Sequence, residues 1–292
     1  MRLPLKRNAN RNRRLLVGAL LCAAVGLQCH HSGPRDTLAG VDEIPIEMAH
    51  LSGLSADPAD EMERLARQDP LAFLKACRDH YDRTVRDYDC TFIKQELVQG
   101  RLTAEQWTSV RFRDEPYSVD MTWTRNPMLV SRALYVEDKW WNGDVPQAWV
   151  RPAGALLKLV KLKQDIRGKA AGTQSRRTID EFGFRNSLDL IIHYSEKAHE
   201  EGMLDLEYIG QATVGERPTY VFERRLPYTG DEEVYPDRLL RIFIDKEWML
   251  PTCCISYADD EGTQLLGKYV LIDVELNPGY TDADFDPDNI RF

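Results

Sequence analysis

The sequence comprises 292 residues, of which 47 are acidic and 38 are basic, and its net charge is −9. This balance argues against a nucleic-acid-binding protein, because contacts with phosphates require a positive surface. The length suffices for one large domain or two small ones, and the chain shows no internal repeat and no Pro- or Ser-rich linker beyond residue 60. One domain is therefore expected.

The first 29 residues have the layout of an export signal. Six basic residues precede an uncharged apolar run from Leu15 to Leu27. This run is shorter than the roughly 20 residues of a membrane span. Removal of residues 1–29 would leave 32 basic and 47 acidic residues, a net charge of −15. The sequence thus predicts an exported protein of the bacterial envelope, located in the periplasm.

The sequence of the leader is compatible with more than one mode of processing. Ala24-Val25-Gly26 offers a small-x-small cleavage site, whereas Cys29 is a candidate for lipidation that would anchor the protein in a membrane. Gln28 stands where a lipidation motif has a small residue. An uncleaved anchor is a third alternative. We expect residues 30–56 to form a disordered tether and residues 57–292 to form a single domain.

Helical patterns occur in two regions. A helical region opens at Asp57-Pro58, and a clearer helix begins at Asp69-Pro70, where proline suits the first turn. A further helix is expected in the middle of the chain, capped by Asn186 or Ser187 and ending near Glu201.

Elsewhere the apolar period is two, which predicts strands. They begin at Tyr88 and continue over residues 117–124, 134–136, 140–150 (with a turn at 142–144), 204–214, 218–226, 238–245, 250–257 and 265–276. Because the strands come in runs without βαβ alternation, the sheet should be antiparallel. The expected fold class is α+β, with helices covering one apolar face of an open antiparallel sheet.

Four cysteines follow the leader: Cys77, Cys90, Cys253 and Cys254. In an oxidising compartment one disulfide is compatible with them, and buried thiols are the alternative. Cys253 and Cys254 are adjacent, so on a strand they would point to opposite faces. The cysteine and histidine spacings do not match a zinc site, and we expect neither a metal nor a cofactor.

Several stretches resemble a bacterial envelope family known as domain of unknown function 1571, namely Asp87–Glu96, Pro116–Trp123, Leu134–Glu137 and Asp282–Asn289. This resemblance extends over about residues 70–292. The late strands also resemble the lipoprotein carriers and receptors LolA and LolB, at 242–245, 250–251 and 267–277. That resemblance implies an open half-barrel with helices as a lid over its concave face. It also implies binding of lipid or lipoprotein acyl chains.

Apolar side chains on the expected strands are the candidate ligand-binding wall, since pockets for apolar ligands are mostly hydrophobic and aromatic. The best stripe alternates with polar residues over 117–124. The candidates are Tyr117, Val119, Met121, Trp123, Leu134, Val136, Ile242 and Ile244. Ordinary core packed beneath a helix is the alternative interpretation.

Residues 155–177 form a basic stretch in an otherwise acidic chain. Five of its side chains are candidates for docking on an anionic membrane surface, at up to about 1 kcal/mol each: Lys158, Lys161, Lys163, Arg167 and Lys169. A solvated loop or an edge strand blunted by lysines is the alternative.

Two acidic or histidine-containing patterns do not favour a metal site. The run from Asp282 to Asp288 resembles the start of a calcium loop, but Pro287 occupies the glycine position, so turn and capping roles are expected. On the central helix, His193 and His199 lie about 240° apart and do not converge.

The chain shows none of the sequence motifs of common hydrolases or nucleotide-binding enzymes. We therefore expect a non-catalytic carrier or receptor for lipid or lipoprotein acyl chains. A sensory or interaction module that binds a membrane-protein partner and an unrecognised envelope hydrolase are the alternatives. The sequence does not indicate the oligomeric state.

Overall fold

The computed structural model describes residues 46–48, 61–154, 160–290 and 292. Its helices are α1 (Glu61–Gln68), α2 (Pro70–Thr84), α3 (Lys169–Gly172) and α4 (Phe184–Glu200), with 3-10 turns η3 (Ile179–Glu181) and η4 (Asp282–Phe285). The strands are β1 (Ile46–Met48), β2 (Asp87–Val98), β3 (Arg101–Leu102), β4 (Gln106–Arg113), β5 (Ser118–Arg125), β6 (Val130–Val136), β7 (Trp141–Asn142), β8 (Val145–Pro152), β9 (Leu162–Asp165), β10 (Asp205–Val214), β11 (Arg217–Arg225), β12 (Leu239–Asp245), β13 (Pro251–Tyr257) and β14 (Leu265–Leu276).

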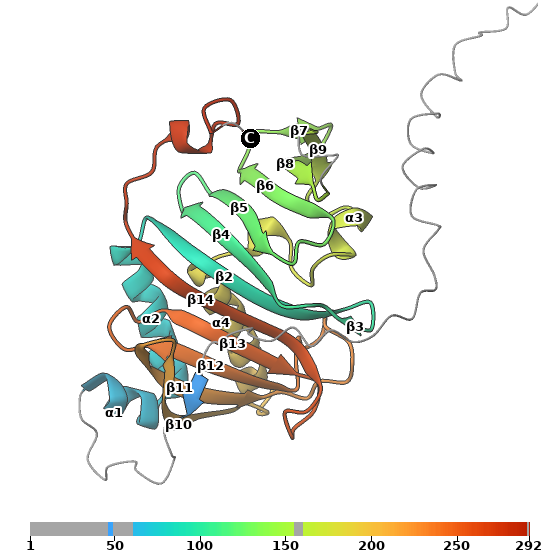
Figure 1. The fold of residues 1–292 in the computed structure, drawn as a ribbon. Helices are drawn as coiled ribbons and strands as arrows, with labels where there is room; N and C mark the ends of the chain where they lie inside the picture. Colours follow the sequence, from blue (N-terminus) through green and yellow to red (C-terminus); the bar gives the residue numbers. More distant parts are fainter. Residues whose placement is uncertain (1–45, 49–60, 155–159, 291) are drawn as a thin grey trace, which may run out of the picture. The chain divides into compact units, whose positions relative to one another are not determined.

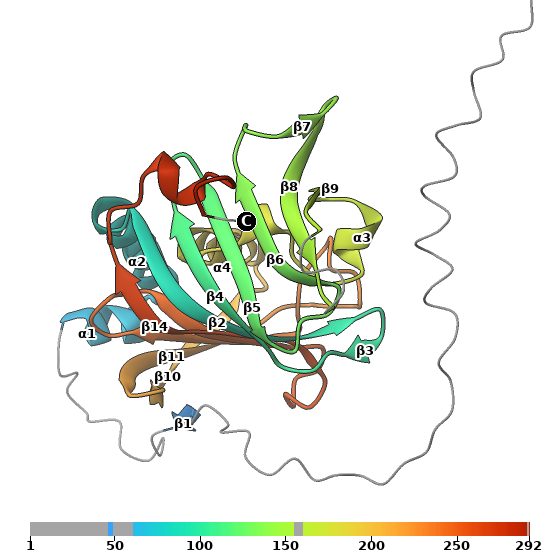
Figure 2. The same cartoon turned by 45° about the horizontal axis from the view of Figure 1, so that its top comes forward.

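The described strands form one open sheet in the order β1-β10-β11-β12-β13-β14-β2-β4-β5-β6-β8-β7, with β3 paired to β2 and β9 to β8. Each pair is antiparallel, including the central pair β14 and β2 that joins the two ends of the chain. The order begins and ends on different strands, so the sheet does not close. Figures 1 and 2 show α2 and α4 on the same side of this sheet. The predicted α+β fold with an open antiparallel sheet is confirmed.

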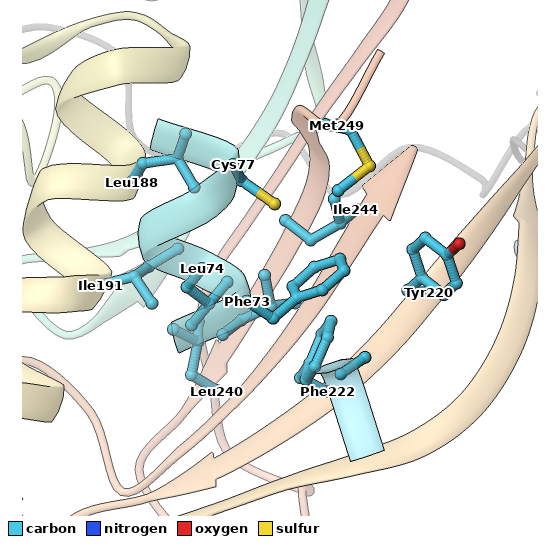
Figure 3. Close-up of a cluster of buried hydrophobic side chains, with 12 residues drawn as sticks. Phe73, Leu74, Cys77, Leu188, Ile191, Tyr220, Phe222, Leu240, Ile244 and Met249 are labelled. Atoms are coloured by element: carbon cyan, nitrogen blue, oxygen red, sulfur yellow. The ribbon is translucent and has the colours of Figure 1, made fainter. Parts of the chain in front are cut away.

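Helix α2 begins where the sequence predicted. Asp69 accepts a hydrogen bond from the Ala72 amide at 2.9 Å, and Pro70 follows in the first turn. The apolar face of α2 then packs on β11 and β12. Figure 3 shows Phe73 of α2 beside Tyr220 and Phe222 of β11, whose ring centroids lie 5.3 and 5.0 Å from that of Phe73. The α4 residues Leu188 and Ile191 join the same buried cluster, which fixes both helices on this face.

Helix α4 begins earlier than predicted, because Gly183 and not Asn186 or Ser187 is its N-cap residue. Gly183 has a φ of +118°, and a Cβ at this position would lie 3.1 Å from the Tyr88 hydroxyl. A glycine is therefore required for the helix to approach β2 so closely. The Asn186 side chain instead donates to the carbonyl of Phe182 at 3.0 Å.

The sheet face opposite the helices is also apolar. Phe243, Cys253 and Val270 belong to a cluster that contains no helical residue, whereas Cys254 packs against the helix-covered cluster. The adjacent cysteines thus point to opposite faces, as predicted from strand geometry. The four described cysteines are free thiols, which matches the buried-thiol alternative and not the disulfide.

The C-terminal segment covers β5 and β6 on the face away from α4. Figure 2 shows this segment, in red, crossing these strands. Phe285 and Phe292 pack there with Leu134 and Val136. The outward side chains Ser118 and Asp120 of β5 are therefore buried as well, whereas Thr122 and Thr124 farther along the strand are exposed.

The segment 30–56 is not irregular throughout, because Ile46–Met48 pairs with Ala212–Val214 as strand β1. An edge strand such as β10 presents unpaired backbone groups, and β1 satisfies them. The rest of this segment, the leader and Cys29 lie outside the described residues. Among the helices that the structure describes, none has the length and apolar character needed to cross a bilayer.

Candidate functional site

A cavity of about 440 Å³ lies between the concave, helix-bearing face of the sheet and the segment from β9 to the start of α4. Strands β2, β4, β5, β6, β8, β13 and β14 all contribute to its wall. This volume is within the range of small-molecule sites. The cavity is partly open to solvent, so a ligand has a route of entry.

One part of the wall is apolar. In the sheet register, Met121, Ala133 and Val150 face one another across β5, β6 and β8, and all three line the cavity. Val110 of β4 continues this row but is buried in the core beside the cavity. Further apolar side chains from the sheet and from the segment above it complete this part: Phe92, Trp123, Val130, Ala148, Ile166, Ile179, Phe182 and Leu271. Of the eight candidate wall residues, Met121 and Trp123 line the cavity.

Four further candidates face the same side of the sheet but are covered by protein. Val119 is buried in the same cluster as Phe184 of α4, and Ile242 and Ile244 are buried in the cluster that contains the apolar face of α2. The Tyr117 hydroxyl lies 2.8 Å from the Phe182 carbonyl oxygen, and burial raises the pKa of this tyrosine. These residues form the core that supports the cavity.

The placement of Leu134 and Val136 in the ligand-binding wall is wrong. Their neighbours Ala133 and Tyr135 point toward the concave face, so strand alternation turns Leu134 and Val136 to the opposite one. There the C-terminal segment buries them. The structure does not bring them to the cavity.

The other part of the wall is a buried polar cluster around Glu96. Its carboxylate accepts hydrogen bonds from Lys94 Nζ at 2.8 Å and from the hydroxyls of Tyr269 and Ser175, both at 3.0 Å. The backbone amide of Arg176 adds a fourth donor at 3.3 Å. Burial and the neighbouring Glu96 carboxylate raise the pKa of Tyr269. The charge of Glu96 is thus compensated inside the protein.

Arg176 attaches the segment above the cavity to strand β13 and to the loop between β11 and β12. Its guanidinium donates to the Pro236 carbonyl at 3.0 Å and to Ser256 Oγ at 3.2 Å, and it pairs with Glu232 at 3.0 Å. Together with the Ser175 contact to Glu96, these bonds hold residues 175–176 across the cavity.

The polar cluster is not identified from the sequence, although the strand pattern of β2 indicates two of its members, Lys94 and Glu96. Lys94 and Glu96 have the same parity as Tyr88 and Phe92 in β2, so alternation places both charges on the inward face. Inward charges on a strand are uncommon and require partners. Ser175 has no such signal, because it belongs to an irregular segment.

The described residues of the basic stretch are partly neutralised within the protein. Lys161 lies 3.7 Å from Asp288, and Arg167 pairs with Asp180. Lys161 and Lys163 also stand over the Trp149 ring, at 5.5 and 5.2 Å from its centroid. Lys169 is the first residue of α3. Lys158 lies outside the described residues, and membrane docking stays a prediction.

The C-terminal carboxylates have the turn and capping contacts expected of them. Asp284 accepts from the Thr281 amide at 2.8 Å, and Asp286 accepts from the Asp288 amide at 2.9 Å. On α4, Glu196 forms an ion pair with Lys75 at 2.7 Å. Within the described part of the chain, no three His, Cys, Asp or Glu side chains are grouped so that they could hold a metal ion.

The model of the family described as protein of unknown function (DUF1571) matches residues 85–292. The chain belongs to the DUF1571 family. The resemblance stated from the sequence is confirmed, and the match includes the polar cluster, all the residues that line the cavity and the C-terminal segment. No curated protein matches the chain.

Among solved structures, the chain is similar to the lipoprotein LppX of Mycobacterium tuberculosis, with 10% identity and a TM-score of 0.38 over 75% of this chain and 100% of that one. A DUF1329 family protein from Desulfovibrio piger has 15% identity and a TM-score of 0.36 over 73% and 97%. A LolA superfamily protein from Nitrosomonas europaea has 10% identity and a TM-score of 0.29 over 74% and 98%. Similarity at these identities and TM-scores gives no information about function.

Proposed function

We propose that this protein binds acyl chains of a lipid or lipoprotein, without catalysis, in the cavity beneath residues 164–191. The observation that supports this most is the apolar wall formed by Met121, Ala133 and Val150, which borders an unfilled space of about 440 Å³. Burial of an acyl chain there would release about 0.8 kcal/mol per methylene group removed from water.

The export signal predicted over residues 1–29 implies that the protein acts outside the cytoplasm. An exported acyl-chain binder would work in the bacterial envelope, as a shuttle if the leader is cleaved near Gly26 or as a fixed receptor if Cys29 is lipidated. Fractionation of cells expressing the full chain, with mass measurement of the mature N-terminus, distinguishes these two products. Recovery of the full-length chain in the cytoplasm would contradict both.

Binding is tested by filling the cavity. Ala133 lines the cavity, so Ala133→Phe should block it, whereas Thr122→Phe adds the same ring on an exposed side of the adjacent strand. Delipidated wild type and Thr122→Phe should bind a fluorescent fatty acid, and Ala133→Phe should lose at least tenfold in affinity while still unfolding cooperatively. If delipidated wild type binds no acyl probe and native mass spectrometry finds no copurified lipid, the proposal is wrong.

A further inference from the structure

Two buried polar groups on β4, beside the cavity, lack hydrogen-bond partners among the described residues. They are the Nε2 group of Gln106 and the Oγ1 group of Thr108 on β4, and their residues are 2% and 1% exposed. An unpaired buried polar group costs about 1–3 kcal/mol. Two such groups on one strand therefore need an explanation.

The identity of the free Gln106 group follows from its neighbour. Trp123 Nε1 donates to Gln106 Oε1 at 2.8 Å. An indole nitrogen only donates, so this contact fixes the side-chain oxygen toward Trp123 and leaves the NH₂ group as the free one. The unpaired group of Gln106 is thus a hydrogen-bond donor.

A third donor lies directly opposite on the next strand. Lys94 is the register partner of Gln106, and Phe92 is the partner of Thr108. The described partners of the Lys94 ammonium are Glu96 and Ser175, both at 2.8 Å. An ammonium carries three N–H groups, so one of them is free for a ligand.

These donors stand at the beginning of the apolar part of the wall. Lys94, Thr108 and Trp123 all line the cavity. The apolar row begins at Val110, which is the next inward residue after Thr108 on β4, and continues through Met121 and Ala133 to Val150. Its last three members line the cavity. It crosses three strand spacings of about 4.8 Å each. A ligand whose hydrogen-bond acceptors lie at one end of an apolar chain matches this arrangement.

We propose that Lys94, Gln106 and Thr108 bind the carbonyl oxygens of an acyl group, with its chain along the apolar row. This assignment rests on the proposed function and adds the polarity and orientation of the ligand. The Lys94 charge is compensated by Glu96, so the site accommodates the neutral carbonyl of an ester as well as a carboxylate. A cationic head group would meet the Lys94 ammonium and the Gln106 NH₂ group, neither of which accepts a hydrogen bond, so it should bind more weakly.

The test compares three probes of equal chain length: palmitate, methyl palmitate and hexadecylamine, each displacing a fluorescent acyl probe from delipidated protein. Wild type should bind palmitate, methyl palmitate or both at least tenfold more tightly than hexadecylamine. Preference for palmitate would indicate a free fatty acid as the natural source, and preference for the ester would indicate an esterified acyl chain.

Two nearly isosteric variants test whether Thr108 and Gln106 bind the carbonyl group of the probe. Thr108→Val removes the free hydroxyl, and Gln106→Glu keeps an acceptor for Trp123 but replaces the donor by a carboxylate. Each should weaken binding of the preferred carbonyl probe about tenfold, as expected for one hydrogen bond, and leave hexadecylamine binding no weaker. Thr108→Ser should restore binding, and Thr122→Val, which removes an exposed hydroxyl, should have no effect.

The outcomes separate this inference from the proposed function. Equal binding of all three probes, or unchanged carbonyl binding in both variants, overturns the carbonyl site while acyl-chain binding stands. Binding of none of the probes overturns both. Thermal unfolding of each variant identifies any that fail to fold, and Thr108→Val and Gln106→Glu provide two independent measurements.

Discussion

Arg132 of β6 binds both carboxylate oxygens of Asp120 on β5, with Nε 2.9 Å from Oδ1 and Nη2 2.7 Å from Oδ2. Arg111 of β4 also pairs with Asp120, and the Phe292 ring lies 4.9 Å from the Arg132 guanidinium carbon. One carboxylate, 3% exposed, therefore connects three strands and the C-terminus on the sheet face opposite α4.

Replacement of this carboxylate should be costly. Asp120→Ala leaves two arginines without their shared partner, and we expect a loss of about 3 kcal/mol of unfolding free energy. The value is at the lower end for a broken buried pair, because both arginines keep some contact with water. Urea denaturation measures it. Asp144→Ala in an exposed turn should change stability by less than about 0.5 kcal/mol, and equal effects of the two would contradict the role of Asp120.

The C-terminal segment should be essential to the same face. Phe285 is fully buried against Leu134, Val136 and Trp140, and Phe285→Ala should cost about 3–5 kcal/mol in denaturant unfolding. The Ala283→Gly substitution in the same turn, at an exposed residue, should cost less than about 1 kcal/mol. A stable Phe285→Ala variant would show that the segment is only loosely attached.

Leu134 and Val136 show what the sequence could not predict, namely which face of the sheet each side chain occupies and which segment covers it. Local periodicity correctly identified most strands and the helix at Asp69-Pro70, and the order of these elements predicted the antiparallel sheet. Alternation gives two faces but does not say which segment covers each of them. The cover on Leu134 comes from Phe285, about 150 residues later in the chain. The cavity depends on the same kind of distant contact, between Glu96 and Ser175.

Cys254 provides a chemical probe of the cavity. It lines the cavity, and burial raises the pKa of its thiol to about 12. Because the thiolate is the reactive form, iodoacetamide at pH 8 should modify native protein far more slowly than urea-unfolded protein, and the rate should rise with pH. A bound acyl ligand should slow the reaction further. Rapid modification at pH 7, with Cys254→Ser as the unreactive control, would contradict this burial.

The cap of η4 should contribute to stability in a pH-dependent way. Hydrogen bonds from the Thr281 amide and hydroxyl, at 2.8 and 2.7 Å, lower the pKa of Asp284 below its value in an unfolded chain. A lowered pKa in the folded state means that the stabilisation is fully present above the unfolded pKa of about 3.9 and is lost as the pH falls through the folded pKa.

Asp284→Ala should therefore cost about 1 kcal/mol at pH 7, and the difference from wild type should shrink between about pH 4 and pH 2. Urea unfolding across this range measures the change. Asp288→Ala, at an exposed carboxylate outside the cap, is the control. A wild-type advantage that is constant with pH would show that Asp284 contributes through packing and not through its charge.

Arg176 should control the release of a bound ligand, because it fastens residues 175–176 over the cavity through Pro236, Ser256 and Glu232. Arg176→Ala removes these attachments. Bonds to a charged group contribute about 1.5 kcal/mol or more each, so an acyl probe should dissociate at least tenfold faster, as measured by stopped-flow displacement. Amide hydrogen exchange over residues 169–183 should accelerate in parallel.

The adjacent Arg177 is a matched control for this prediction. Arg177 has the same charge and also borders the cavity, but its ion pair with Glu181, at 3.9 Å, lies within the same segment and does not attach that segment to the sheet. Arg177→Ala should leave dissociation within about twofold of wild type, since such exposed pairs contribute little. If both variants accelerate release equally, positive charge near the cavity holds the ligand; if neither does, the ligand enters and leaves without movement of this segment.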